Sequence, residues 1–265
     1  MLTPEQLASF EKQGYATVDS PLTAQQLMAA EMAHDRLLSP TRQGAPRYKC
    51  FNSSLSAPLY SDPDFVRTIS HPFFEAVAKQ ILRASEVDYI EAFPLSRNPT
   101  MPHPPEWPTW REAWAKGCHC DVQLTREDWD ATPRRDQLMM WLWLSDAHPE
   151  RGAMRVLPGS HLAIMDHWQA VLRPNRRQYL PRVHGARPRP EPSATQYPEG
   201  LPDSLGGGDK FCDTEPIPAV ARRGQIMIHS GALLHSAWCV PTMYVHLNIV
   251  PYERQIEGIL LIPYL

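Results

Sequence analysis

The sequence predicts a mainly β domain with flanking helices, in which an N-terminal helical layer packs on a β-sandwich or barrel. Helix-like segments fill most of the chain before Asp88. From Asp88 onward the chain consists of short apolar or alternating runs bounded by Pro, Gly and Asp, which is typical of strands. The 28 prolines favour turns and loops and argue against a helical bundle.

The first predicted element is a helix that opens the chain. Thr3 is suited to the N-cap, Pro4 to the first helical position, and Gly14 to the residue that ends the helix. A short strand over 15–20, "YATVDS", follows directly.

Two more helices are expected before the strands begin, over 22–38 and over 62–82. The second of these is predicted as one continuous helix. The helix over 22–38 has apolar residues near helical spacing and is expected to be amphipathic. These residues are Leu22, Leu27, Met32 and Leu37.

The strand-like runs lie on both sides of a long segment that is rich in Pro, Arg and Gly, over 166–217. We expect one domain over 1–265, with 166–217 as an insert or lid, because this segment has few periodic apolar positions. The proline-rich and aromatic stretch 97–115 is expected to line a pocket. The core strands are placed within about 86–165 and 218–255, at 87–95, 118–125, 137–147, 153–160, 224–231 and 244–252.

Charge and cysteine content exclude several classes of protein. The net charge of −3 provides no basic field for nucleic acid or an anionic membrane. No apolar run is long enough to span a bilayer, and the first residues do not resemble a secretion signal. The five cysteines, sparse and odd in number, fit a reducing cytoplasm, so a cytoplasmic protein is expected.

The stretch "CHCD" at 118–121 is the first candidate site. In a strand His119 and Asp121 share one face, whereas Cys118 and Cys120 share the other and are expected to be core residues. A His-x-Asp pair can provide two ligands of a 2-His-1-carboxylate triad, which leaves open positions on Fe(II).

A third ligand for such a triad has to come from another strand. The segment "GQIMIHSGALLHSAW" offers two histidines, His229 and His235. The spacing of the residues alone leaves both open.

The order of these motifs resembles the phytanoyl-CoA dioxygenase-like family of Fe(II)/2-oxoglutarate-dependent oxygenases. The resemblance is carried by the His-x-Asp pair, "WLWLSDA", "GAMRVLPGSH" and "GQIMIHSGALLH". It implies a double-stranded β-helix, that is, a cupin-like jelly roll with helices packed outside. The metal ligands it implies are His119, Asp121 and His235, because "GALLH" fits the family pattern better than the context of His229 does. The carboxylate of Asp121 favours hydroxylation or a related oxidation over halogenation.

The chain departs from the family pattern where 2-oxoglutarate is held. The family places an arginine about ten residues after the distal histidine, where it forms a bidentate pair with the far carboxylate. Here the next arginine is Arg254, at +19 from His235. Tyr244 and His246 share a strand face where that arginine would lie, so we expect them to bind the carboxylate instead.

Other residues are candidates for supporting roles. Trp141 matches a family position that contacts the cosubstrate, while His161 is expected to order a loop. Arg97 and Arg223 are further candidates for the carboxylate, without a spacing argument.

The function that the resemblance implies is that of a mononuclear non-haem Fe(II) oxygenase, which uses 2-oxoglutarate and O2 to oxidise a small organic or natural-product-like substrate. Two alternatives stay open. One is an Fe(II) enzyme that does not use 2-oxoglutarate, either an isomerase or a cosubstrate-independent oxygenase. The other is a non-catalytic metal-binding protein on the same fold.

Overall fold

The computed structural model describes residues 1–42, 62–96, 114, 137–148, 153–165, 214–236 and 243–251. The predicted strand at 118–125, most of the stretch 97–115, and all but the last residues of the segment 166–217 lie outside these ranges. Among the described helices, none is long and apolar enough to cross a membrane.

Helix α1 (Pro4–Gln13) has the ends that the sequence predicts. The side chain of Thr3 accepts a hydrogen bond from the backbone of Gln6, and the side chain of Gln6 accepts one from the backbone of Thr3. This capping box satisfies two backbone donors at the start of the helix. Gly14 ends the helix in the left-handed conformation, with φ 82°.

Helix α2 (Ala24–Arg42) is amphipathic, as expected. Leu22 and Leu27 are buried and Leu37 packs against the same core cluster, but Met32 is 56% exposed, so Met32 does not belong to the buried face. Met32 follows Leu27 by five residues, which corresponds to about 140° around an α-helix.

The segment 62–82 forms two helices, α4 (Pro63–Ile69) and α5 (Pro72–Leu82), and the prediction of one continuous helix is wrong. His71 has extended backbone angles, φ −62° and ψ 129°, and acts as the N-cap of α5. The residue before a proline is disfavoured in the helical region, so Pro72 ends one helix and begins the next.

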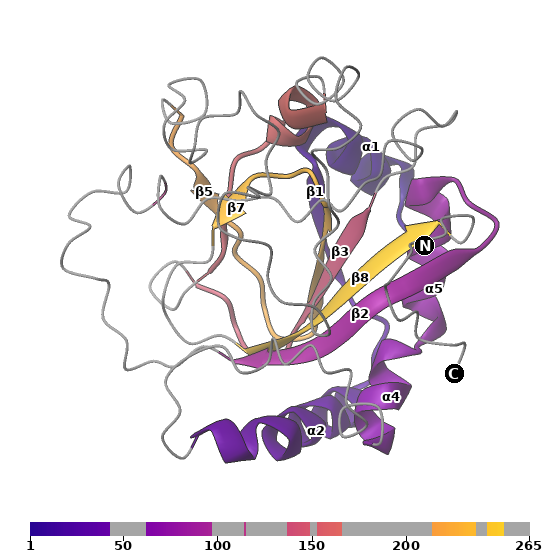
Figure 1. Ribbon diagram of the computed structural model, residues 1–265, viewed down its shortest axis with the longest axis vertical. Helices are drawn as coiled ribbons and strands as arrows, with labels where there is room; N and C mark the ends of the chain where they lie inside the picture. Colours follow the sequence, from indigo (N-terminus) through magenta and orange to yellow (C-terminus); the bar gives the residue numbers. More distant parts are fainter. Residues whose placement is uncertain are drawn as a thin grey trace, which may run out of the picture.

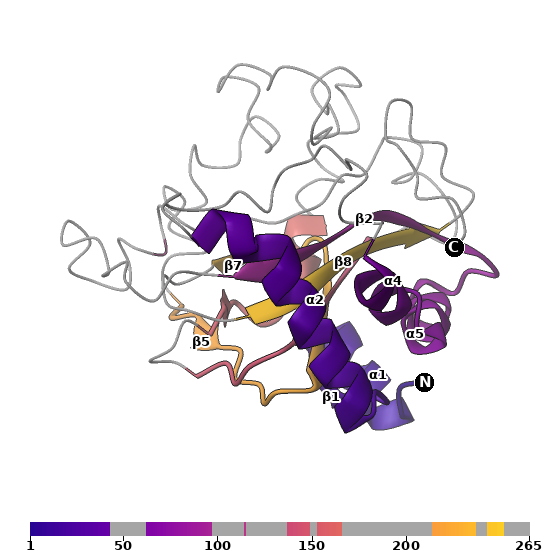
Figure 2. The same cartoon turned by 90° about the horizontal axis from the view of Figure 1, so that it is seen from below.

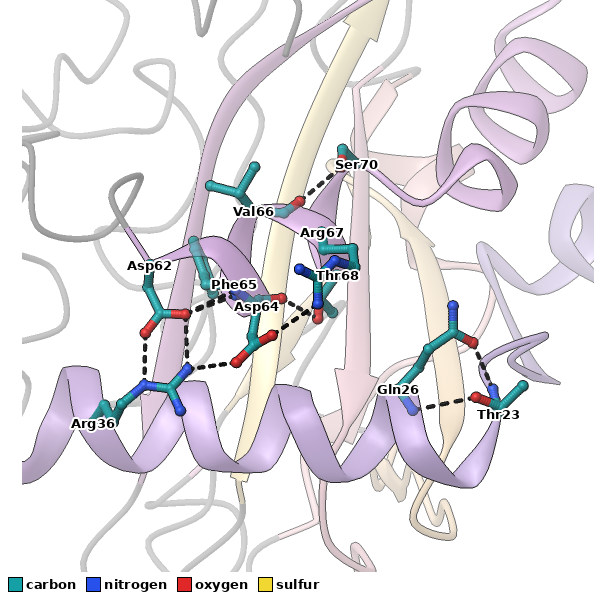
Figure 3. A network of polar contacts seen from close by, with 10 residues as sticks. All are labelled: Thr23, Gln26, Arg36, Asp62, Asp64, Phe65, Val66, Arg67, Thr68 and Ser70. Carbon is teal, nitrogen blue, oxygen red and sulfur yellow. Dashed lines mark hydrogen bonds and ion pairs between the residues drawn. The ribbon is translucent and has the colours of Figure 1, made fainter.

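A polar network joins α2 to the start of α4 (Figure 3). The guanidinium group of Arg36 donates to both carboxylate oxygens of Asp62, at 2.8 and 3.0 Å, and to Asp64 at 2.9 Å. Asp62 is also the N-cap of α4 and accepts from the backbone of Asp64 and Phe65. The carboxylate of Asp62 therefore caps α4 and also binds Arg36 of the adjacent helix α2.

Five antiparallel strands form the larger sheet, in the order β1-β6-β3-β8-β2 (Figure 1). The strand that follows α1 in sequence pairs with β6 at one edge of this sheet. The strands are β1 (Tyr15–Asp19), β2 (Val87–Ser96), β3 (Leu138–Trp143), β6 (Gln225–Ser230) and β8 (Met243–Pro251).

A smaller sheet has the order β5-β4-β7. Its strands are β4 (Arg155–Val156), β5 (Ile217–Pro218) and β7 (His235–Ser236).

All six residues of the central strand β3 are buried, because the larger sheet is covered on both faces. Its residues Leu138, Met140 and Leu142 pack in one cluster with helical residues such as Phe65 and Phe74. Seen from below, α2 lies in front of β2 and β8 (Figure 2). The alternate residues of β3, Met139, Trp141 and Trp143, belong to a second buried cluster. The expected mainly β architecture with flanking helices is confirmed, and closure into a jelly roll stays a prediction.

Candidate active site

The candidate site lies on the face of the larger sheet that is turned away from the helices. Met139, Trp141 and Trp143 of β3 form a buried cluster there with Met227 of β6 and Val156 of β4. This cluster includes residues of both sheets, so it occupies the space between them. Since successive residues of a strand point to opposite faces, the alternation along β3 separates this cluster from the helical core.

Two histidine rings join this cluster. His229 and His235 are 0% and 1% exposed, and their ring centroids lie 5.0 Å apart. The Trp141 ring centroid lies 5.5 Å from that of His229 and 6.0 Å from that of His235, with the latter two rings nearly perpendicular at 89°. Two imidazoles and an indole therefore form one packed group.

Backbone carbonyls determine the tautomer of both histidines. Nδ1 of His235 lies 2.9 Å from the carbonyl oxygen of Leu233, and Nδ1 of His229 lies 2.9 Å from that of Ser230. A carbonyl oxygen only accepts, so Nδ1 carries the proton in each ring. In the neutral ring the lone pair is then on Nε2, and this arrangement is typical of histidines that bind metals.

A turn after β6 brings the two histidines together. Within this turn the hydroxyl oxygen of Ser230 accepts from the backbone of Ala232 at 3.2 Å. The chain then enters the smaller sheet, where His235 pairs with Val156. The turn thus carries the chain from one sheet to the other, and it places in contact two rings that are six positions apart in the sequence.

Some predicted site residues lie outside the described ranges, and others are described only in part. His119, Asp121 and Arg97 are outside. Among described residues, no three His, Cys, Asp or Glu side chains form a group that could hold a metal ion. In β8, His246 pairs with Trp141 and Tyr244 with Trp143, which gives their register positions.

Arg223 does not belong to this site. Its backbone N–H donates to Asp146 at 2.8 Å, and its guanidinium group forms an ion pair with Glu31 of α2. The hydrogen bond with Glu31 raises the pKa of the guanidinium group. Arg223 therefore links the turn before β6 to the helical layer.

The expectation that His161 orders a loop is wrong, because residues 160–165 are helical and His161 lies within them. Its ring is buried and its Nε2 lies 3.2 Å from the carbonyl oxygen of Glu11, to which it donates. Burial lowers the pKa of the imidazole. The side chain thereby ties the segment after β4 to α1.

Comparison with solved structures gives similar folds at low sequence identity. The carbocyclase SnoK from nogalamycin biosynthesis, described as non-haem and alpha-ketoglutarate-dependent, has a TM-score of 0.58 and 16% identity, over 94% of this chain and 84% of that chain. The epimerase SnoN, solved with Fe3+, alpha-ketoglutarate and nogalamycin RO, has a TM-score of 0.58 and 17% identity, over 93% and 82%. EctD from S. alaskensis, solved with bound Fe, has a TM-score of 0.59 and 17% identity, over 97% and 79%.

No curated protein matches the sequence. The family model for phytanoyl-CoA dioxygenase matches residues 10–238, which include β1, the turn after β6, both buried histidines and most of the described sheet. The chain therefore belongs to the phytanoyl-CoA dioxygenase family.

Proposed function

We propose that this chain is a mononuclear non-haem Fe(II) oxygenase that uses 2-oxoglutarate and O2 to oxidise a small organic substrate. The observation that carries the proposal is the buried imidazole of His235, with its Nδ1 proton bound to the Leu233 carbonyl, in a chain that belongs to this family. SnoN and EctD, which share the fold, were solved with iron.

In this proposal Fe(II) is held by His119, Asp121 and His235. His235 fits the role, because its neutral ring offers the Nε2 lone pair that a metal requires. The bound iron, with the cosubstrate, supplies the activation of O2 that C–H oxidation needs. The chain's own contribution is to fix the ligands and keep the surroundings dry.

The surroundings of His235 are suited to excluding water. Trp141, Trp143, Met227 and Val156 are buried on the same side of the larger sheet. We propose that the two sheets close into a jelly roll around this region and that the site lies between them. A site closed to water strengthens the electrostatic interactions within it and protects reactive species from side reactions.

We propose that Tyr244 and His246 bind the far carboxylate of 2-oxoglutarate, in place of the family arginine. Their register positions opposite Trp143 and Trp141 support this, because those residues belong to the cluster between the sheets. Trp141, which lies beside both histidine rings, is proposed to contact the cosubstrate.

The first prediction concerns the metal. We expect each of His119→Ala, Asp121→Ala and His235→Ala to lower the Fe(II) stoichiometry well below one per chain, because each removes a ligand. Metal analysis of anaerobically loaded protein measures this, with His161→Ala as a control that keeps iron. Full stoichiometry in His235→Ala together with loss in His229→Ala would show that the third ligand is His229.

The second prediction concerns the cosubstrate. We expect Tyr244→Phe and His246→Ala each to weaken 2-oxoglutarate binding about tenfold or more, since each removes a hydrogen bond to a charged carboxylate, which contributes roughly 1.5–3 kcal/mol. Anaerobic titration of the Fe(II) protein, followed by the metal-to-ligand charge-transfer band, measures the affinity. Val245→Ala, whose register position is opposite Leu142 of the helix-facing cluster, is the matched control. Unchanged affinity in both variants would exclude these residues as the clamp.

A second candidate function is favoured by the missing arginine. No arginine occurs between His235 and Arg254, so an Fe(II) enzyme that does not use 2-oxoglutarate is the alternative. It predicts no charge-transfer band in the wild-type protein and no succinate during turnover. SnoK and SnoN, named as a carbocyclase and an epimerase, show that hydroxylation is not the sole outcome found on this fold.

A further inference from the structure

His229 is a buried polar residue with apolar neighbours on the sheet. Its register partner on β3 is Met139, its neighbour two residues earlier on the same strand is Met227, and the ring of Trp141 lies against it. Burying a polar group costs free energy that an apolar side chain does not incur. A methionine or phenylalanine would suit this packing better, so the imidazole is explained best by a use for its nitrogen atoms.

The nitrogen that the Ser230 carbonyl does not engage is Nε2. The Ser230 carbonyl, 2.9 Å away, accepts the proton of Nδ1, so Nε2 of the neutral ring is a hydrogen-bond acceptor. An acceptor does not pair with the carboxylates of 2-oxoglutarate, which are acceptors as well. It pairs with water or with an O–H or N–H group.

The position of His229 relates this acceptor to the iron site. Its ring packs on the ring of His235 at 5.0 Å and 61°, and Trp141 contacts both. The His235 ring is thus held by the Leu233 carbonyl at Nδ1 and by two flanking rings.

We propose that His229 is a positioning residue of the iron site: it holds the ring of His235, and its Nε2 accepts a hydrogen bond from a water molecule or an O–H or N–H group bound beside that ring. This inference rests on the proposed function. Residues that orient metal ligands from the outside contribute to metal affinity, and their replacement typically costs about 10–100-fold.

The test compares two variants of His229 by anaerobic Fe(II) titration of the full chain. His229→Phe keeps a ring and removes the nitrogen, whereas His229→Gln keeps an acceptor oxygen. We expect His229→Phe to keep one iron per chain but to bind it about 10–100-fold more weakly. His229→Gln should bind more tightly than His229→Phe. Ile228→Val, on the same strand but in the helix-facing cluster, is the matched control and should bind iron as the wild type does.

Thermal unfolding of the iron-free proteins separates this role from simple packing. We expect iron-free His229→Phe to be at least as stable as the wild type, because an apolar ring replaces a buried polar one. Lower stability of this variant with wild-type iron affinity would reduce His229 to a packing residue. An affinity of His229→Gln no better than that of His229→Phe would overturn the acceptor role.

Two further outcomes would overturn the inference in different ways. Complete loss of iron in His229→Phe, as expected for His235→Ala, would make His229 a ligand. Absence of stoichiometric iron in the wild type would overturn the proposed function and this inference together, whereas wild-type affinity in His229→Phe would overturn the inference alone.

Discussion

Gly14 is the residue at which α1, β6 and the segment after β4 meet. Its backbone N–H donates to the Phe10 carbonyl at 2.7 Å, and its own carbonyl accepts from Ser230 at 2.9 Å. A Cβ atom at this position would lie 2.5 Å from Nδ1 of His161, closer than real Cβ contacts come. The absence of a side chain at Gly14 is therefore needed for the left-handed backbone and for the close approach of His161.

We predict that Gly14→Ala destabilises the protein more than Gly159→Ala does. Both glycines have positive φ, 82° and 78°, so both variants incur roughly 1–2 kcal/mol for a left-handed backbone. Only Gly14→Ala also has to displace the buried ring of His161. At Gly159 the nearest atom to a Cβ would be the Lys12 carbonyl oxygen, at 3.8 Å. Urea unfolding measures both, and equal losses would contradict the steric argument.

At the scale of elements, α2 and α4 are joined by Arg36, which pairs with the carboxylates of Asp62 and Asp64. Asp62 has two roles in this network. It caps α4 and pairs with Arg36 of α2 (Figure 3). The hydrogen bond from Arg36 is the main cause of a lowered pKa for Asp62. The stabilisation from this shift is complete above the pKa that the carboxyl has in the unfolded chain, and it is lost as the pH falls through the folded value.

We predict that Asp62→Ala and Asp62→Asn differ in how much stability they lose at neutral pH and at acid pH. Asp62→Ala should lose the cap, typically about 0.5–2 kcal/mol, in addition to the ion pair. Asp62→Asn keeps a capping oxygen and loses only the charge, so it should be less destabilised at neutral pH and should lose less stability below about pH 4. Urea unfolding at pH 7 and at acid pH measures this. An unchanged acid dependence in Asp62→Asn would show that the pair with Arg36 does not contribute to it.

At the scale of the whole molecule, the larger sheet separates two buried regions. Met140 lies in the cluster shared with the helices, and Met227 lies in the cluster shared with the smaller sheet and the two histidines. One face of the larger sheet therefore packs in the core with the helices, and the other face carries the candidate site.

We predict that Met140→Ala and Met227→Ala have similar costs in stability and different costs in iron binding. Both side chains are fully buried, so each variant should lose about 2–5 kcal/mol. Only Met227→Ala should also weaken Fe(II) binding, because its cavity opens beside Trp141 and His229. Calorimetry of the iron-free proteins and anaerobic Fe(II) titration measure the two effects. Equal iron affinity in both variants would show that the two faces are not functionally separate.

The sequence by itself determined the local structure and the family. The N-cap at Thr3, the helix end at Gly14 and strands within the runs 87–95, 137–147 and 224–231 depend on residues close together in the chain, and all are found. The boundary at His71 and Pro72 also has a local cause, and it was missed because the apolar pattern continues through it. The motifs that carry the family resemblance likewise survive in short segments, and the family match confirms them.

Tertiary structure alone decided which distant residues meet. It placed β1 beside β6, turned Met32 to the surface, and paired Arg223 with Glu31 in place of a cosubstrate. It also put His229 against His235, although the sequence offered them as alternatives. The physical reason is that strand alternation specifies a face but not the partner across it. That partner depends on the pairing of strands and on a turn that carries the chain from one sheet to the other.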